Sequence, residues 1–366
     1  MDLATLSRQQ GDFYVPACAV CVAGKDLLRD HVVAITQAEV DLKLDAAGRF
    51  SFTIVDAFDF DAREFLTGDG NGNLIELLAF GATIEIAMGY GDTKSLRTLI
   101  SGVVTQITTD FNEDGSPELT VSGYDNAFPM MAGKSSKSWT QRRDSDVVQE
   151  IAGANHLDTD IVSTKEDLHQ IEQNQQGALE FINKLAARNG YEAYVTGTTL
   201  HFRPSQNQGT GVVTLEWGKT LLSFRPDGNI AGQISGVEVY GWDPKTKDRI
   251  VGRAMHGEEP GRDPGRQSGG DEITAVLRKQ PILRVRQPVF SAADATERAR
   301  ALLKERADQF LTGEGETVGI PDIVPGRNIT LSGLGKKFSK TYYVQEATHR
   351  FDSGGYRTRF MVKDPT

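Results

Sequence analysis

Residue types that often carry metal, redox or hydrolytic chemistry occur in this sequence, but their spacing does not build a complete site. Cys18 and Cys21 have the separation of a redox or zinc pair. Zinc would need a second pair of ligands, and the chain has no other cysteine. The pair lies inside an apolar strand, where positions three apart face opposite sides, whereas redox pairs begin a helix. We interpret both cysteines as small buried hydrophobic residues.

A turn rich in Asp, Asn and Gly at residues 69–73 resembles the start of a calcium-binding loop. Such a loop needs glycine at its sixth position and glutamate at its twelfth, and the chain has Leu74 and Phe80 there. Asp, Asn and Gly are also the residues that tight turns favour. We therefore expect a turn without bound calcium.

Carboxylates, histidines and serines form no catalytic pattern. Asp56, Asp59 and Asp61 are candidates for the paired acids of a glycosidase, but nothing in the sequence selects a pair. The histidines, at positions 31, 156, 169, 201, 256 and 349, lack metal-ligand spacing. The sequence has neither a Gly-x-Ser-x-Gly elbow nor a phosphate-binding glycine loop. We predict that the protein is not an enzyme and uses no cofactor or metal.

Length and composition favour a soluble, β-rich protein of two or three domains. The chain has 366 residues, of which 39% are hydrophobic and 25% charged, with 38 glycines. Its net charge of -10 argues against nucleic acid or an anionic membrane as the main partner. No apolar run is long enough to cross a membrane, and the amino terminus lacks the features of a secretion signal. The two cysteines fit a reducing compartment.

Two similar β-hairpins, far apart in the sequence, are the strongest structural signal. Residues 99–111 and 118–122 alternate apolar and polar side chains around a turn that contains Gly and Pro. Residues 341–351 and 356–363 do the same around a turn of Asp, Ser and Gly. Each hairpin has one wet and one buried face. The repetition suggests an architecture that is built twice.

We divide the chain into two β units and an insert between them. Residues 1–128 form the first β unit, with a short helix at 61–66. Residues 129–205 form a small α/β insert, whose second helix covers 177–189. Residues 206–366 form the second β unit.

Two further elements are predicted in the second β unit. Residues 255–272 contain many Gly and Pro and few hydrophobic side chains, so we interpret them as a mobile loop. Residues 291–311 carry a hydrophobic stripe at helical spacing. Ser291, followed three positions later by Asp294, resembles a capping box. We therefore predict a helix over 291–311.

A series of stretches resembles the late-control D and VgrG-type hub proteins of contractile phage tails and related contractile injection systems. The stretches are 85–90, 100–107, 119–125, 180–191, 199–202, 323–331 and 342–349. Their order and spacing over nearly the whole chain carry the resemblance, since each alone is a weak strand-and-turn signature. The positions that match the pattern are Gly89, Tyr90, Gly102, Gly123, Tyr124, Asp125, Gly190, Pro325 and Gly326.

The resemblance implies two tail-tube-like antiparallel β-barrels and a small α/β domain. It also implies a homotrimeric baseplate hub, in which six barrels adapt a three-fold spike to the six-fold tail tube. The implied partners are a separate spike protein, the tail tube protein, and baseplate wedge and tape-measure proteins. Specific nucleic-acid binding and stable membrane insertion are not implied. Such a protein is made in the bacterial cytoplasm and acts in the virion or injection particle.

Two departures from the pattern bear on the spike. Many VgrG-type proteins continue into a small barrel and a needle-like β-helix, and this sequence stops at Thr366, just after the closing hairpin. Some hubs associate with a lysozyme module, which is not visible in the sequence. We therefore expect the spike to be a separate protein or to have been removed from this chain.

Other functions stay open. Residues 129–205 could form a wall-binding or cleaving unit, which would make the protein a tail-associated cell-wall hydrolase. The loop at 255–272 could belong to a receptor-binding or effector component. For the hub, we also predict that the two β units superpose. Its channel wall should be neutral or acidic, because a basic wall would retain DNA or acidic cargo.

Overall fold

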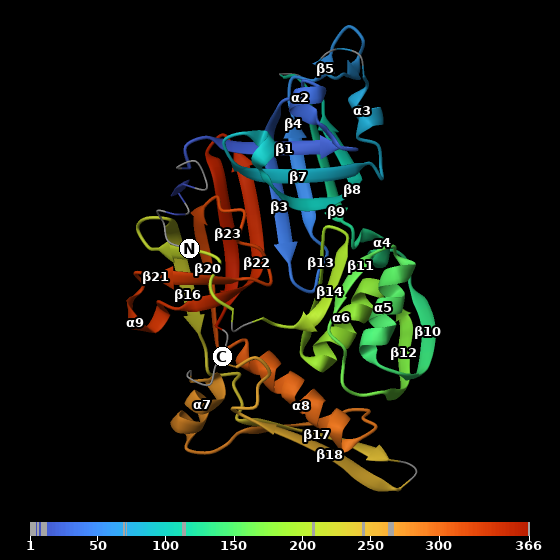
Figure 1. Ribbon diagram of the computed structural model, residues 1–366, viewed down its shortest axis with the longest axis vertical. Coiled ribbons are helices and arrows are strands. Elements are labelled where there is room, and N and C mark those ends of the chain that lie inside the picture. Colours follow the sequence, from blue (N-terminus) through green and yellow to red (C-terminus); the bar gives the residue numbers. More distant parts are fainter. Residues whose placement is uncertain are drawn as a thin grey trace.

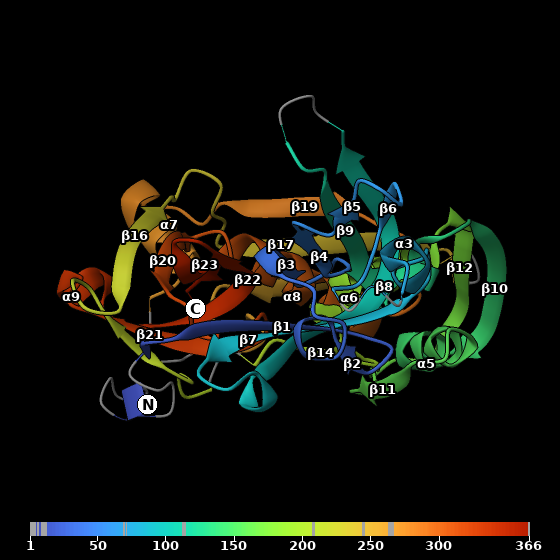
Figure 2. The same ribbon diagram turned by 90° about the horizontal axis from the view of Figure 1, so that it is seen from above.

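The protein is mainly β, as the sequence predicts, and an α/β insert lies beside its largest sheet (Figure 1). The computed structural model describes residues 5, 7–8, 13–68, 70, 72–111, 115–206, 209–243, 246–262 and 267–364. Viewed from above, the insert and the short helix α9 (Gly335–Phe338) lie at opposite sides of the molecule (Figure 2). None of the helices in the described residues combines the length and apolar character needed to cross a membrane.

The first part of the chain and the insert contribute these elements. Strands of the first part are β1 (Pro16–Val22), β2 (Lys25–Asp26), β3 (Ile35–Lys43), β4 (Arg49–Ile54), β5 (Phe58–Asp59), β6 (Glu64–Phe65), β7 (Thr83–Tyr90), β8 (Arg97–Asp110) and β9 (Glu118–Asp125). Its short helices are α2 (Leu27–Asp30), α3 (Leu74–Leu77) and the 3-10 helix η2 (Thr93–Ser95). The insert comprises α4 (Phe128–Met131), β10 (Ser135–Arg142), α5 (Asp144–Ala154), β11 (Asp158–Ile161), β12 (Leu168–Gln176), α6 (Ala178–Asn189), β13 (Tyr191–Thr196) and β14 (Thr199–Pro204).

The remainder of the chain forms two further groups of elements. One group comprises β15 (Thr214–Glu216), β16 (Leu221–Gly228), β20 (Leu311–Val318), β21 (Asn328–Ser332), α9, β22 (Thr341–Asp352) and β23 (Gly355–Lys363). The other, which lies between β16 and β20 in the sequence, comprises β17 (Gly236–Asp243), β18 (Asp248–Met255), α7 (Gly269–Leu277), β19 (Ile282–Arg286) and α8 (Ala292–Ala307).

A single 13-stranded sheet joins the two predicted β units. Its main order is β16-β20-β23-β22-β3-β4-β9-β8-β7-β1-β2, with β21 and β15 branching from β22. The link is the antiparallel pairing of β22 with β3, which runs from Glu346 opposite Lys43 to Phe351 opposite Ala38. Both predicted hairpins are present, as β8–β9 and β22–β23. The closing hairpin is therefore shared between the two halves of the sheet.

Two apolar cores lie against this sheet. The core of the first part includes Phe52, Ile84 and Val121, and Tyr356 of the closing hairpin also belongs to it. The core of the second part surrounds Tyr342. In strands such as β4 and β9, alternate residues enter these cores while the intervening residues are more exposed, which is the alternation expected of a strand with one buried face.

Strands β17 and β18 lie within residues 206–366, but they do not join the large sheet. They form a separate sheet in the order β18-β17-β19. Helix α8 covers one face of this sheet and packs Ala295 and Ala299 against Val237. Gly252 permits the close approach, because a Cβ there would lie 2.2 Å from the backbone carbon of Ala295. The helix and its three strands thus form a fourth unit with its own core.

Helix α8 begins as predicted but ends earlier. The Ser291 Oγ accepts a hydrogen bond of 2.9 Å from the Asp294 amide, which is the predicted cap. The helix ends at Ala307 rather than at residue 311, because Leu311 already begins strand β20. Helix α6 ends as predicted, with Gly190 in the left-handed region at φ 67°.

The predicted helix at residues 61–66 is absent. Asp59 does cap this segment, since its Oδ1 accepts hydrogen bonds from the amides of Asp61 and Ala62. The chain then turns and pairs β6 with β5, which brings the Phe65 and Phe58 rings edge to face at 5.1 Å between centroids. Aromatic packing across this short ribbon overrides the weak helical pattern.

The prediction of a mobile loop over residues 255–272 is wrong at its C-terminal end. Residues 269–272 begin helix α7, which has a capping box between Ser268 and Asp271. The Asp271 carboxylate also accepts hydrogen bonds from His256 at 2.7 Å and from Arg262 at 2.9 Å. Polar contacts rather than apolar burial therefore hold this segment, which is why the apolar pattern did not reveal it. Residues 263–266 of the predicted loop lie outside the described residues.

A buried histidine sits where the closing hairpin meets the first part. The His349 side chain is fully buried, its Nε2 donates to the Ile323 carbonyl at 2.9 Å, and its Nδ1 accepts from the Tyr356 hydroxyl at 2.8 Å. Burial lowers the pKa of His349 to about 4, and the hydrogen bond to the Ile323 carbonyl only partly opposes this. The neutral imidazole is therefore a structural part of the fold.

We expect the free energy of unfolding to fall as the pH decreases from 6.5 toward 4. Over this range His349 becomes protonated in the unfolded state, whereas burial keeps its imidazole largely neutral in the folded state. The loss attributable to this residue is about 3 kcal/mol at pH 4. Urea unfolding at several pH values measures it. In His349→Gln the stability at pH 7 should be lower, but the loss of stability between pH 6.5 and 4 that His349 causes should be absent.

Asp125, whose pKa is raised to about 6 by burial, changes the stability in the opposite direction. It does so in both proteins, so its effect cancels in the comparison. Parallel pH profiles for the two proteins would contradict the assignment.

Candidate functional site

A buried network of charges connects the insert, the closing hairpin and helix α8. Tyr343 on β22 donates a hydrogen bond of 2.5 Å to Glu192 on β13. Lys363, at the end of β23, lies 2.8 Å from Asp308 and 3.7 Å from Glu192. Lys304 on α8 contacts the same Asp308 oxygen at 2.5 Å. Two lysines and two carboxylates from three parts of the chain thus balance one another.

Burial makes this network consequential. The side chains of Lys363, Lys304 and Glu192 are 5%, 7% and 7% exposed. Burial opposes ionisation of Asp308, but the Lys304 and Lys363 cations outweigh it and hold the pKa of that carboxyl below its usual range. Removal of one charge would leave the remaining charges buried without a partner of opposite sign, which would destabilise the folded protein. The network therefore fixes how the three parts sit together.

The turn between β3 and β4 anchors the insert to the first part. The backbone amide of Asp45 donates to the Ala193 carbonyl at 3.1 Å, and its carboxylate accepts from the Ala193 amide at 3.3 Å. Asn183 on α6 donates to the Asp45 carbonyl at 2.6 Å. Burial raises the pKa of Asp45. The insert is thus held by both β units at once.

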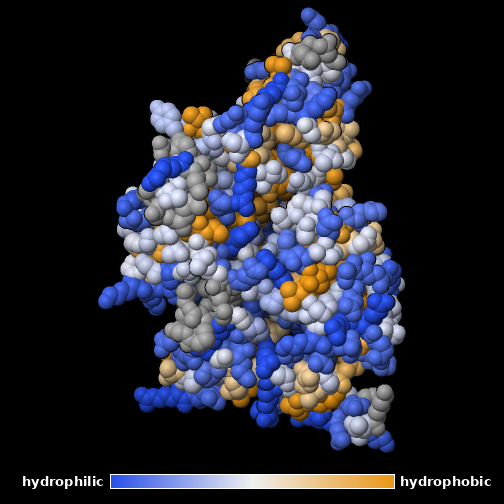
Figure 3. Space-filling view, in the orientation of Figure 1, coloured by the Kyte–Doolittle hydropathy of each residue, from blue (hydrophilic) through white to orange (hydrophobic). Residues whose placement is uncertain are grey.

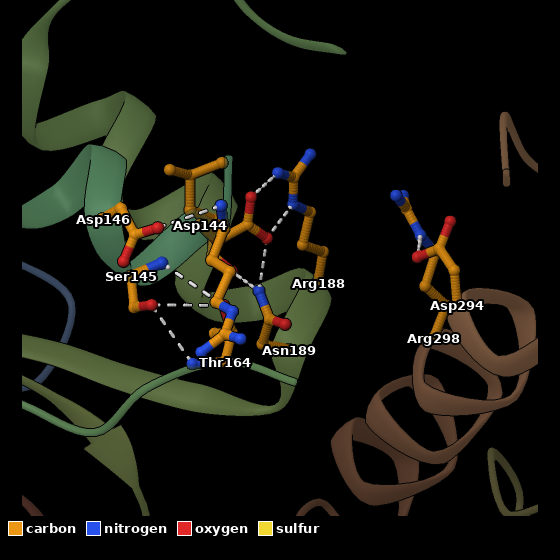
Figure 4. Close-up of polar contacts among 10 residues, drawn as sticks. Asp144, Ser145, Asp146, Thr164, Arg188, Asn189, Asp294 and Arg298 are labelled. Atoms are coloured by element: carbon orange, nitrogen blue, oxygen red, sulfur yellow. Dashed lines mark hydrogen bonds and ion pairs between the residues drawn. The ribbon is translucent and has the colours of Figure 1, made fainter. Parts of the chain in front are cut away.

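A charged cleft of about 410 Å³ separates the insert from helix α8. On the insert side, Arg188 of α6 pairs with Asp144 at the start of α5, and Asn189 donates to the same carboxylate at 2.7 Å. On the other side, Arg298 pairs with Asp294 at 2.9 Å along α8. Figure 4 shows these two ion pairs facing each other across open space.

The two walls of the cleft attract and repel each other at different points. Lys165 of the insert reaches Glu297 of α8 at 3.0 Å and so ties the walls together. Arg188 and Arg298 carry like charges, and burial together with Arg298 lowers the pKa of Arg188 to about 9. Each arginine is paired with an aspartate of its own wall, Arg188 with Asp144 and Arg298 with Asp294. We interpret the cleft as a joint between the insert and helix α8, which the Lys165–Glu297 ion pair spans.

Four of the family-pattern positions lie together where β8 and β9 pair. Asp125 is 6% exposed and accepts hydrogen bonds from the amides of Gly48 at 2.7 Å and Ala127 at 2.9 Å. A Cβ at Gly102 or Gly123 would lie 2.0 Å from a backbone carbonyl oxygen of the neighbouring strand. Tyr124 stacks on Phe128 at the entry to the insert. These four positions therefore fix the backbone where the chain leaves β9 and enters the insert.

The remaining family-pattern positions are spread along the junction. Gly89 and Tyr90 end β7, and Tyr90 contacts Tyr356 of the closing hairpin at 5.8 Å between ring centroids. Gly190 ends α6. Gly326 has φ 80°, and a Cβ there would lie 2.8 Å from the Tyr194 hydroxyl of the insert. Pro325, Tyr194 and Asp125 line one small pocket between the sheet and the insert.

Residues considered for chemistry from the sequence are not brought together. Cys18 and Cys21 are half-buried in β1, and burial raises the pKa of the Cys18 thiol to about 12. Asp56, Asp59 and Asp61 are exposed. Two residues of the calcium-like turn, 69 and 71, lie outside the described residues, and Asn73 caps α3.

The histidines are equally dispersed. His201 and His256 each contact one aspartate, and His349 is buried in the fold. Within the part of the chain that the structure describes, no group of three or more His, Cys, Asp or Glu side chains could hold a metal ion.

Comparison with known proteins identifies the family. The sequence matches the family described as the Alg8 N-terminal domain over residues 15–353. The chain belongs to the Alg8 N-terminal domain family. No curated protein matches the sequence.

Solved structures share the fold of this Alg8 N-terminal domain family member. A 43 kDa tail protein of prophage MuSo2 from Shewanella oneidensis superposes with a TM-score of 0.68 at 15% identity, covering 96% of this chain and 98% of that one. A tail protein from Neisseria meningitidis gives 0.67 at 14%, covering 96% and 97%. An E. coli component of the type VI secretion system, described as similar to T4 bacteriophage tail proteins, gives 0.57 at 13%, covering 94% and 76%. At these identities the likeness concerns the fold.

Sequence reasoning missed the buried charges of this Alg8 N-terminal domain. Lys304 and Asp308, four residues apart on a helix, look like an ordinary surface pair. Lys363 and Glu192 lie in separate strands that nothing in one sequence relates to α8. Lys363 directly follows the apolar run Phe360-Met361-Val362 of β23, and this position is a weak signal of a buried lysine.

Replacing Asp308 with Asn should destabilise the protein by about 3 kcal/mol or more, because it leaves Lys304 and Lys363 buried with only Glu192 for compensation. Urea unfolding at neutral pH measures the change. The matched control is Asp352→Asn, which breaks a solvent-exposed pair with Arg350 and should cost less than about 1 kcal/mol. Equal effects for the two variants would show that the buried network contributes no more than a surface ion pair.

Proposed function

We propose that the protein is a structural baseplate component of a phage tail or related contractile injection system, and that three copies form a hub joining a three-fold spike to the six-fold tail tube. The observation that carries the proposal is the pairing of β22 with β3, which makes the two β parts of one chain neighbours in a continuous sheet. Three such chains can place six β parts around one axis. A trimer can thereby meet a six-fold tube without six copies of the hub.

The exposed face of this sheet supports a role as a channel wall. Its ion pairs cross strands: Arg357 and Arg359 share Glu316 at 2.9 and 3.5 Å, and Lys43 lies 2.9 Å from Glu346. Thr348 donates to Asp41 at 2.6 Å across the joining ladder itself. A polar face whose charges are already paired offers few unsatisfied groups to a passing polymer. This agrees with the expectation of a channel that is not basic.

The names of similar structures support the same setting. The two with the highest TM-scores given above are named as tail proteins, and the third as a component of a secretion system with likeness to phage tail proteins. The hub position, the trimer, and the spike, tube, wedge and tape-measure partners belong to the proposal. So do the superposition of the two β parts and the location in a virion or injection particle. The proposed role is structural, with no reaction assigned to the charged cleft.

The purified protein should behave as a homotrimer of about 120 kDa, three times the 40.0 kDa chain, in size-exclusion chromatography with light scattering. The physical reason is that each subunit supplies only one third of the ring. The same protein should leave bacterial cell walls intact in a turbidity assay, which separates the hub from a hydrolase. A monomer at micromolar concentration that does not shift on addition of spike or tube protein would count against the hub.

A further inference from the structure

The α8 unit, which is helix α8 with strands β17, β18 and β19, has one sheet face covered by the helix and a second face open to solvent. Strands β17 and β18 lie at the lower end of the molecule, with α8 above them (Figure 1). Val237, Val239 and Ala254 are buried on the face that α8 covers. Successive residues of a strand point to opposite faces, so the residues between these lie on the second face. We call it the outer face of the α8 unit.

Four arginines lie on the outer face. They are Arg249 and Arg253 on β18, and Arg284 and Arg286 on β19. The central strand β17 runs between them, with Glu238 opposite both Arg253 and Arg284. The side chains of Arg249, Arg253 and Arg284 are 53%, 71% and 68% exposed. The two outer strands therefore hold guanidinium groups at the surface on both sides of β17.

Of the described residues in these three strands, only Glu238 places a carboxylate on the outer face. This carboxylate lies 3.0 Å from Arg253, 3.6 Å from Arg249 and 4.0 Å from Arg284. The other acidic residues of the three strands, Asp243 and Asp248, alternate to the opposite face at the end of the β17–β18 hairpin. The outer face of these strands thus has a net charge of +3, on a protein whose net charge is -10.

The fold itself gains little from this excess of positive charge. Like charges on neighbouring strands repel each other, and one carboxylate offsets only part of that repulsion. The contact of Glu238 with Arg284 is the longest of its three, at 4.0 Å. Arg286 forms no ion pair within the part of the chain that the structure describes. These two arginines of β19 can therefore pair with an acidic group from outside the molecule.

The composition of the outer face favours a protein as the source of that group. All four cations are arginines, whose planar guanidinium pairs with carboxylates in bidentate geometry. Arginine is also enriched in protein interfaces, whereas lysine is depleted there. Ile282, which is 42% exposed, adds apolar surface beside the arginines of β19. Figure 3 shows hydrophilic and apolar side chains next to one another at this end of the molecule.

A nucleic acid fits the outer face less well. Its backbone would bring many negative charges close to a protein with a net charge of -10. Proteins that bind single strands stack successive bases on open aromatic rings. On the outer face, Arg249 already covers the Tyr240 ring, with its guanidinium carbon 4.2 Å from the ring centroid, and Trp242 at the strand end is the ring that stays exposed. A short acidic segment brings few charges and needs no stacking.

We propose that the outer face of the α8 unit docks an acidic segment of another protein. Glu238 shows how a carboxylate is held there, between guanidinium groups of β18 and β19. Carboxylates of the docked segment pair with Arg284 and Arg286, and apolar side chains beside them contact Ile282. This face belongs to a sheet that is separate from the large sheet. The inference therefore goes beyond the proposed hub and stands whether or not the protein is one.

The test uses the whole purified protein and a fluorescein-labelled, acetylated Gly-Glu-Gly-Asp-Gly-Glu-Gly-Asp peptide, with binding followed by anisotropy. The acidic residues of this peptide lie on one side when it is extended. Wild type should bind it saturably, and more weakly at about 500 mM salt than at about 50 mM. The double variant Arg284→Gln/Arg286→Gln should weaken binding at least about tenfold, because two charge-assisted pairs are lost. Arg286→Gln alone should weaken it severalfold.

The matched control is Arg142→Gln/Arg225→Gln, which removes two arginines from exposed strand positions elsewhere, on β10 and β16. It changes the net charge by the same amount and should leave binding unchanged. Circular dichroism establishes that each variant is folded.

The proposal is overturned if wild type shows no saturable binding, if the two double variants behave alike, or if a peptide with Gln and Asn in place of the acidic residues binds equally well. It is also overturned if duplex DNA or phosphatidylglycerol vesicles bind through Arg284 and Arg286 more tightly than the acidic peptide. Light scattering covers the remaining occupant. If Arg284→Gln/Arg286→Gln changes the oligomeric state of the protein alone, a second copy covers the outer face and the proposal fails.

Discussion

The antiparallel ladder between β3 and β22 is the interaction on which the rest of the structure depends. It converts two β parts from opposite ends of the chain into one sheet, and it places the closing hairpin in contact with both apolar cores. Tyr356 and His349 reach the first core only because this ladder holds the hairpin there. Each part alone would expose a strand edge with unpaired backbone groups, which is a site for unwanted association. Joining the parts removes one such edge from each.

Polar contacts then settle where the insert and the α8 unit lie. The network around Asp308 and Lys363 is buried, and a buried ion pair often contributes less to stability than well-packed apolar residues would. Its charges are directional, however, and they match only when the three contributing parts sit in one arrangement. The cleft between the insert and helix α8 is more open, and the ion pair between Lys165 and Glu297 spans it. The insert is thus held by buried charges on one side and borders a solvent-filled cleft on the other.

Local signals in the sequence predicted local structure well. Alternation gave both hairpins, Ser291 and Gly190 marked a helix start and a helix end, and the order of strands and helices gave the fold class. The β3–β22 ladder could not be predicted, because no pattern in one sequence relates segments so far apart. The separate α8 unit depends on the close approach at Gly252, and glycine in a strand has several explanations. The buried charges were missed for a similar reason, since burial is a property of the assembled parts and not of the residue types.

The length of chain between β3 and β22 has a consequence for how the protein is made. Asp41 and Thr348, which meet across the ladder, are 307 residues apart. At ribosomal rates the second of them follows the first by about 15 to 60 s. During that time the first part has emerged from the ribosome with the edge of β3 still unpaired, so it completes its sheet only when synthesis is nearly over. Long-range pairing of this kind is slow to form. A nascent chain of this protein is therefore a natural client for a chaperone that shields strand edges. Truncation within the closing hairpin would leave strand β3 of the first part without its partner β22.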